Sequence, residues 1–191
     1  YKQNTPDIWS EVASNYNPNK REGHSGVVYN DYLWIFGGRI ENNEMMNDMW
    51  KFPLQSLVQS SLSKTWVQVI YYPYPGARYY HTSFLYNSHW YIFGGRSVSE
   101  MKNDLWRLDL AAITWSEIST ANLKPSAREG SAAVVQGSKV FLFGGRSQSS
   151  NSNELWSMDL SKPAFAWEIE NVASSMTPPA LFQHSALLYG N

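Results

Sequence analysis

The chain has 191 residues, and its 15 Lys and Arg nearly balance its 16 Asp and Glu, so its formal net charge at pH 7 is −1. This balance excludes the basic excess of a general nucleic-acid or anionic-membrane binder, and no apolar run is long enough to span a bilayer. Aromatic residues make up 15% of the chain, too many for a disordered protein, and the absence of cysteine excludes disulfides, thiolate metal sites and cysteine nucleophiles. The chain also lacks an Asn-x-Ser/Thr acceptor site, which favours an intracellular location.

Three copies of one sequence pattern run along the chain. Each copy has a proline, an arginine three residues later, a short apolar run and then a double glycine. An Asn-acid-apolar-Trp group follows each double glycine, and a second tryptophan follows that group. The double glycines are Gly37-Gly38, Gly94-Gly95 and Gly144-Gly145, so the copies are spaced by 57 and 50 residues. This spacing predicts an array of repeated structural units.

Each full copy is predicted to fold as four short β-strands. The copies cover residues 18–70, 75–119 and 125–170. Their apolar runs are rich in β-branched and aromatic residues and are separated by Gly, Pro, Asn and Ser. No segment keeps a 3.6-residue apolar period, so few helices are expected. Residues 55–63 are extra in the first copy and are predicted to lengthen the loop between its third and fourth strands.

Side-chain size changes in a regular way from the first strand of a copy to the last. The first strands, predicted at 24–29, 81–86 and 131–135, carry small residues. The later strands carry tryptophans expected to pack between sheets: Trp50, Trp106 and Trp156 in the third strands, and Trp66, Trp115 and Trp167 in the fourth. A sheet that is narrow at a central axis and wide at its rim needs this gradient, and radial repetition of such sheets gives a propeller. The double glycine is predicted to lie at a sharp turn, where a Cβ would clash.

The order Pro-x-x-Arg, apolar run, Gly-Gly, Asn-acid-x-Trp, Trp resembles the kelch repeat, the blade of kelch-type β-propellers. The resemblance covers nearly the whole chain. It implies an all-β fold of four-stranded antiparallel blades. Kelch rings take about five to seven blades of roughly 50 residues, so three copies predict an incomplete ring.

Both ends of the chain are predicted to hold parts of further blades. Residues 6–13 resemble a fourth strand, because Trp9 stands where each fourth strand carries its tryptophan. Residues 181–190 resemble a first strand, with His184 in the place of His24. Such a fragment has open blade edges, which are a hazard for solubility. We expect missing blades of a larger propeller, or another chain, to complete the ring.

The resemblance also implies a ligand face, formed by the loops after the double glycines and the loops before the first strands. An arginine follows each double glycine, and these residues are expected to form an arc around one mouth of the channel: Arg39, Arg96 and Arg146. The loops before the first strands add Arg21, Arg78, Arg128, Tyr79 and Tyr80. Because guanidinium groups bind carboxylates and phosphates in a bidentate manner, such an arc suits an acidic or phosphorylated peptide.

A structural interpretation of these arginines stays open beside the binding one. Asp48, Asp104 and Glu154 also recur in every copy, eight or nine residues after the arginine that follows the double glycine. An ion pair that pins each loop would be repeated for structural reasons alone. Arg21, Arg78 and Arg128 belong to the repeat itself, and for them the structural role is favoured.

Evidence for an enzyme is weak. Three of the four histidines occupy one repeat position, and no pair has metal-ligand spacing. Kelch-type copper-radical oxidases need a cysteine, which is absent. Kelch-type specifier proteins bind iron through Glu-x3-Asp-x3-His, and here Phe52 and Leu108 stand at the His positions. The chain is therefore predicted to use no cofactor and to serve as a protein-interaction module. Two alternatives remain: a non-catalytic part of a kelch-type enzyme or of a propeller fused to a catalytic domain, or a structural component of a large assembly.

Overall fold

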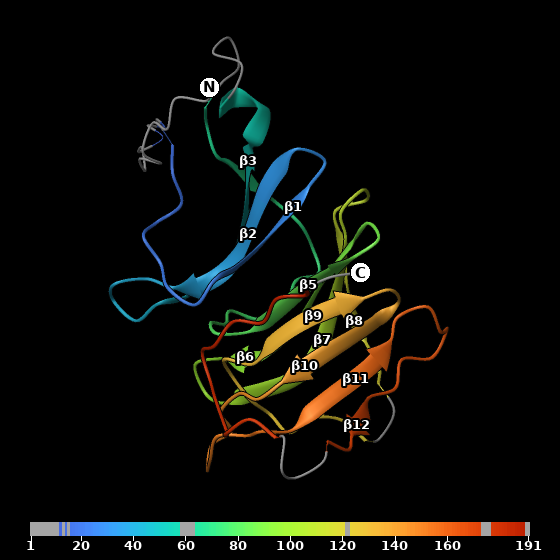
Figure 1. Cartoon of the computed structure of the whole chain (residues 1–191). Coiled ribbons are helices and arrows are strands. Elements are labelled where there is room, and N and C mark those ends of the chain that lie inside the picture. Colours follow the sequence, from blue (N-terminus) through green and yellow to red (C-terminus); the bar gives the residue numbers. More distant parts are fainter. Residues whose placement is uncertain are drawn as a thin grey trace, which may run out of the picture.

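The computed structural model describes residues 12, 14, 16–57, 64–120, 123–172 and 177–189. In these ranges the strands form three four-stranded antiparallel sheets, here called blades 1 to 3 (Figure 1). Blade 1 holds β1 (Ser25–Tyr29), β2 (Tyr32–Arg39), β3 (Met45–Pro53) and β4 (Val67–Val69), with a short 3-10 helix η1 (Leu54–Leu57) after β3. Blade 2 holds β5 (Thr82–Tyr86), β6 (His89–Arg96), β7 (Met101–Asp109) and β8 (Thr114–Ile118). Blade 3 holds β9 (Ala132–Gln136), β10 (Lys139–Phe143), β11 (Leu155–Asp159) and β12 (Glu168–Glu170).

The strand order within each blade follows the chain from the inside of the array to its rim. The first strands β1, β5 and β9 contact one another in sequence, and β4, β8 and β12 lie at the outer edges (Figure 1). The predicted all-β fold of four-stranded antiparallel blades is confirmed, and the three sheets do not close into a ring. Within the described ranges, no helix is long and apolar enough to cross a membrane.

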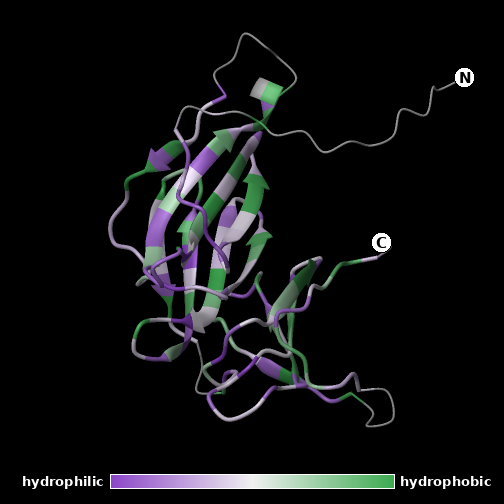
Figure 2. Ribbon diagram, turned by 90° about the vertical axis from the view of Figure 1, so that its left-hand side faces the viewer, coloured by the Kyte–Doolittle hydropathy of each residue, from purple (hydrophilic) through white to green (hydrophobic). Residues whose placement is uncertain are grey.

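Large apolar side chains fill the spaces between blades. Trp34 and Phe36 of blade 1 pack with Trp90 and Trp115 of blade 2 in one buried cluster. A second cluster joins blades 2 and 3 and includes Trp167. Hydrophobic and hydrophilic residues alternate along several strands (Figure 2), because successive side chains of a strand point to opposite faces of its sheet. Burying each such side chain stabilises the fold by about 1.5–3 kcal/mol, so the blades hold together mainly through these contacts.

In blades 1 and 2 the double glycine is part of a strand rather than a turn that ends it. In blade 1, β2 continues through both glycines to Arg39, with a β-bulge between Phe36 and Gly38. Blade 2 has the same bulge, whereas in blade 3 the strand ends at Phe143. The sharp turn expected from the sequence is therefore a bulge, which bends a strand while pairing resumes beyond it. The predicted crowding is present, because a Cβ on Gly38 would lie 2.9 Å from the carbonyl oxygen of Glu22.

Replacing Gly95 with alanine should destabilise the protein by about 2 kcal/mol or more. Gly95 has φ of +90°, and a Cβ there would lie 2.8 Å from the Cβ of His81, so the change adds both backbone strain and a clash. Gly137→Ala is the matched control: φ is also positive, +58°, but nothing lies within 4 Å of the new Cβ. Urea unfolding should show a loss of only about 1 kcal/mol for the control. Equal losses would mean that crowding between blades contributes nothing.

Two predicted end segments have different outcomes. The outer strand predicted at 6–13 lies outside the described residues except for Val12. Most of the insertion at 55–63 also lies outside them, and its first three residues belong to η1. Residues 181–189 carry no assigned strand, so a first strand at 181–190 stays a prediction. They do dock on blade 3: the backbone N–H of Gly145 donates to Leu181 at 2.8 Å, and that of Gln183 donates to Gly130 at 2.7 Å.

Candidate functional site

The repeated arginines fall into two sets with different surroundings. In the first set, each arginine is buried within its own blade and faces the acid of the Asn-acid-x-Trp group. Arg78 binds Asp104 through two hydrogen bonds of 2.7 Å and also donates to the carbonyl of Gly94 at 2.9 Å. The other pairs of this set are Arg21 with Asp48 and Arg128 with Glu154. These side chains are only 2–3% exposed, so their guanidiniums are used inside the blades.

The acid of each pair also binds the tryptophan two residues later. The indole N–H donates to Asp48 from Trp50 at 2.6 Å and to Asp104 from Trp106 at 2.9 Å. Burial alone would raise the pKa of Asp104, but the hydrogen bonds and charge of Arg78 hold that pKa below its usual value. The acids are therefore ionised and committed to the first arginine set, not to the arginines that follow the double glycines.

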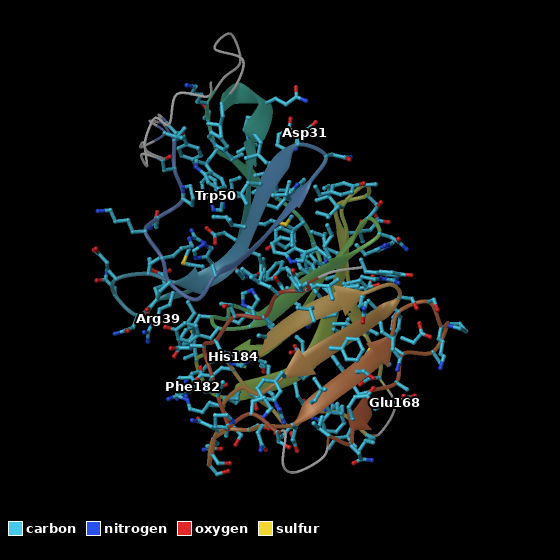
Figure 3. All side chains as sticks on the ribbon, in the orientation of Figure 1. Asp31, Arg39, Trp50, Glu168, Phe182 and His184 are labelled. Atoms are coloured by element: carbon cyan, nitrogen blue, oxygen red, sulfur yellow. The ribbon has the colours of Figure 1, made fainter. Side chains whose placement is uncertain are left out.

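The arginines that follow the double glycines, Arg39, Arg96 and Arg146, lie at one end of the blades, here called the arginine face. Each exchanges two backbone hydrogen bonds with a residue before its own first strand, as Arg39 does with Glu22 at 2.9 and 3.0 Å. The equivalent partners are Tyr79 for Arg96 and Glu129 for Arg146. Figure 3 shows Arg39 and Phe182 toward this end, whereas Asp31 lies at the opposite end of the β1–β2 hairpin.

Two of these three arginines are held on both sides. The guanidinium of Arg39 hydrogen-bonds Glu22 and lies over the ring of Tyr79 at 4.6 Å. The guanidinium of Arg146 hydrogen-bonds Glu129 and lies over the ring of Phe182, also at 4.6 Å. Each therefore bridges an acid of its own blade and an aromatic ring of the next segment, an arrangement that fixes the side chain.

Arg96 is the least constrained arginine of this set. Within the described ranges its guanidinium makes no hydrogen bond, and Oε1 of Glu129 is 3.9 Å away. The side chain is 44% exposed, close to the 41% of Arg146, so the difference between them lies in partners rather than in exposure. The cause is a change in sequence: Tyr79 rather than a carboxylate stands before the first strand of blade 2.

The two candidate tyrosines occupy different environments. Tyr79 is 7% exposed and lies beneath Arg39. Tyr80 is partly exposed, and its hydroxyl donates to Oε2 of Glu22 at 3.2 Å. Hydrogen bonds from Arg39 and Tyr80 lower the pKa of Glu22. Of the two, Tyr80 is the side chain available for contact, and Tyr79 supports an arginine.

A cavity also lies where the first strands begin. This cavity of about 300 Å³ is lined by the repeat-position residues His24, His81, Ser131 and His184, together with Tyr80 and its equivalents. Nε2 of His81 lies 2.6 Å from Oγ of Ser25 in the preceding blade. Burial lowers the pKa of His24, and burial with the charge of Arg78 lowers that of His81 to about 3. Both imidazoles are therefore neutral at pH 7, and that of His81 links blade 2 to blade 1.

Among the described residues, no group of three or more His, Asp or Glu could hold a metal ion. The site is thus a surface of guanidinium, carboxylate and aromatic groups. A family profile described as the KLHDC2/KLHL20/DRC7 Kelch-repeats domain matches residues 4–191. The chain belongs to the kelch-repeat family.

Kelch-repeat relatives of known sequence match the chain over part of their length. Kelch domain-containing protein 3 of Rattus norvegicus is 29% identical over 131 residues, which is 63% of this chain and 33% of the rat protein. Host cell factor 2 of Homo sapiens is 29% identical over 150 residues, 67% of this chain and 18% of that protein. The chain thus spans a third or less of the length of these relatives.

A solved kelch-like structure shows the same architecture. The structure of YjhT superposes with a TM-score of 0.65 and 17% sequence identity, covering 84% of this kelch chain and 54% of that chain. At this identity the likeness shows the fold alone.

One residue of the arginine face was missed by the sequence-based prediction. Phe182 carries the ring beneath Arg146, as Tyr79 does beneath Arg39. A signal was available, because His184 aligns with His81 and so places Phe182 in register with Tyr79. Extending the repeat alignment by two residues would have found it.

Proposed function

We propose that the chain is a protein-interaction module that binds an acidic or phosphorylated segment on its arginine face, with Arg96 as the main anchor. The observation that carries this proposal is the contrast between Arg96 and its two equivalents. Arg39 and Arg146 already hydrogen-bond carboxylates of their own blades, whereas among the described residues the exposed guanidinium of Arg96 has only a 3.9 Å ion pair with Glu129 and no hydrogen bond. An arriving carboxylate or phosphate would accept hydrogen bonds from that guanidinium in a bidentate manner.

The buried set contributes to this function only indirectly. Arg21, Arg78 and Arg128 fix the ends of the loops within each blade, and their side chains are almost fully buried. We propose that they hold the face rigid, so that little ordering is needed when a partner binds. Binding by such a preformed face, rather than catalysis, is the function that these residues support best.

Arg96→Ala is expected to weaken binding of an acidic probe about tenfold and to reduce the salt dependence of the affinity. The probe is a fluorescein-labelled peptide of alternating Glu and Gly, or the same peptide with phosphoserine in place of Glu, and the readout is fluorescence anisotropy. Lys162→Ala is the matched control, because it removes one positive charge from the exposed turn between β11 and β12. Unchanged affinity for the Arg96 variant would remove the anchor role.

We also propose that the open ring is completed by further blades or by another chain. The docking of Leu181 and Gln183 supports this, because both repeat backbone hydrogen bonds that seat blades 2 and 3: Gly38 and Gly95 donate to Arg78 and Arg128 as Gly145 donates to Leu181. Gel filtration of the native polypeptide, with its mass, tests the idea. A closed, well-behaved monomer of these residues alone would contradict it.

A further inference from the structure

A cavity of about 470 Å³ opens beside the arginine face, at the rim of blade 2. It lies between the start of β7 and the chain that leaves β8, and we call it the rim cavity. Asn103, Asp104, Leu105 and Thr120 are among its lining residues. Met101, which also lines it, pairs directly with Arg96, so the cavity adjoins the proposed anchor. Its volume falls within the range of about 300–1,000 Å³ that is usual for ligand pockets.

The repeat identifies what stands in this place in blade 1. The outer strands pair in the same register in both blades, Met49 with Val69 in blade 1 and Leu105 with Ile118 in blade 2. Two residues beyond that pair, blade 1 has Tyr71 and blade 2 has Thr120. The two positions are therefore equivalent, and the side chain in blade 2 is much smaller.

In blade 1, Tyr71 donates a hydrogen bond to the backbone carbonyl of a residue that is not paired between β2 and β3. The β-bulge at the double glycine removes Asn47 from the pairing of β2 with β3. The hydroxyl of Tyr71 donates a hydrogen bond to the carbonyl oxygen of Asn47. Its ring lies 6.1 Å from Tyr74 and 6.4 Å from Trp115, in an edge of the aromatic packing. Tyr71 thus closes the rim of blade 1 with a phenol.

Blade 2 has the same β-bulge, but it has no tyrosine at the position equivalent to Tyr71. The pairing of β6 with β7 omits Asn103, and so does the pairing of β7 with β8, which begins at Leu105. Thr120 is too short to act as Tyr71 does, and both Thr120 and Asn103 line the rim cavity. The backbone carbonyl oxygen of Asn103 is equivalent to that of Asn47, which accepts the hydrogen bond from Tyr71.

We propose that the rim cavity binds the side chain of a tyrosine from a partner protein, with its phenol donating to the carbonyl of Asn103. The inference rests on the proposed function, because the partner is the one held on the arginine face. The charged lining favours a neutral phenol over phosphotyrosine. Lys102 already pairs with Glu100 at 2.5 Å, Asp104 is bound by Arg78, and Glu117 offsets Lys124.

The test uses the native full-length polypeptide and N-acetyltyrosinamide as the probe, followed by NMR titration of Thr120 and Leu105. Saturable binding is expected, and N-acetylphenylalaninamide, which lacks the hydroxyl, should bind about fivefold more weakly. Thr120→Tyr fills the cavity from within and should weaken the probe at least tenfold, whereas Thr120→Ser leaves the cavity open and should not.

Several outcomes would overturn the inference. No shift of the two resonances at saturating probe, or equal binding of the two amides in wild-type protein, rules it out without any variant. Tighter binding of phosphotyrosine amide than of N-acetyltyrosinamide would show that the cavity prefers an anion to a neutral phenol. Arg96→Ala should leave the tyrosine amide unaffected, so a failure of the arginine anchor and a failure of the rim cavity give different results.

Discussion

Replacing Arg78 with alanine is expected to lower the free energy of unfolding by about 3–5 kcal/mol, because the change leaves the carboxylate of Asp104 without its buried partner. Arg78 is 2% exposed and makes two hydrogen bonds of 2.7 Å to Asp104. It also donates to the carbonyls of Gly76 and Gly94, so the loop before blade 2 and the double glycine of that blade both lose a partner. Urea unfolding of the native chain measures the loss.

Two variants separate geometry from charge. Arg78→Lys keeps the positive charge but has no planar fork, so it should recover only part of the lost stability. Arg96→Ala removes an arginine of the exposed set and should change the unfolding free energy by less than about 0.5 kcal/mol. A small loss for Arg78→Ala, comparable to that for Arg96→Ala, would show that the two sets do not differ as their burial indicates.

The fold was predictable because its determinants are local and repeated. Double glycines, short apolar runs and tryptophans at regular spacing each indicate a blade, and the same pattern three times reduces the chance of error. The outer tryptophans show why this works: Trp115 packs between blades 1 and 2, and Trp167 packs between blades 2 and 3. The exact strand ends differ by a few residues, because the bulge lets β2 continue to Arg39.

The partners of the arginines could not be assigned from spacing. The acid of each blade lies eight or nine residues after the exposed arginine, and the sequence left open a pair between them. In the structure Asp48 instead meets Arg21, 27 residues away. The β-bulge and the loop before the first strand bring these residues together, and residue spacing alone does not reveal either contact. Long-range contacts of this kind need the register of the strands.

The repeat also predicted three equivalent arginines on the arginine face, and the structure makes them unequal. Their surroundings depend on one variable position before each first strand: Glu22, Tyr79, Glu129 and Phe182 along the chain. A carboxylate there binds the arginine of its own blade, and an aromatic ring supports the arginine of the preceding blade. Blade 2 has the ring, so Arg96 is left without a carboxylate of its own blade. The environment of the proposed anchor Arg96 is thus set by a departure from the repeat.

Lowering the pH from 6.5 to 4.5 is expected to reduce the free energy of unfolding by about 2 kcal/mol through His81 alone. Burial, with the charge of Arg78 and of His24 adding to it, lowers the pKa of His81 to about 3, while the nearby Asp104 opposes the shift. The unfolded chain takes up a proton near pH 6.5 and the folded chain does not. The stabilisation is therefore complete above pH 6.5 and is lost as the pH falls from 6.5 toward 3.

His81→Gln removes this titration, so its unfolding free energy should depend less on pH by about 1.4 kcal/mol per pH unit between pH 4.5 and 6. The variant also loses packing against Phe36, whose ring centroid lies 5.5 Å away, so the slope and not the value at pH 7 is the readout. Carboxylates with lowered pKa, such as Asp104, act at lower pH, because the unfolded chain protonates them only near pH 4. His89→Gln, at the start of β6, is the control for the effect of replacing a histidine with glutamine. Parallel pH profiles for wild type and His81→Gln would show that the buried imidazole does not resist protonation, and the junction between blades 1 and 2 would then have to admit a charge.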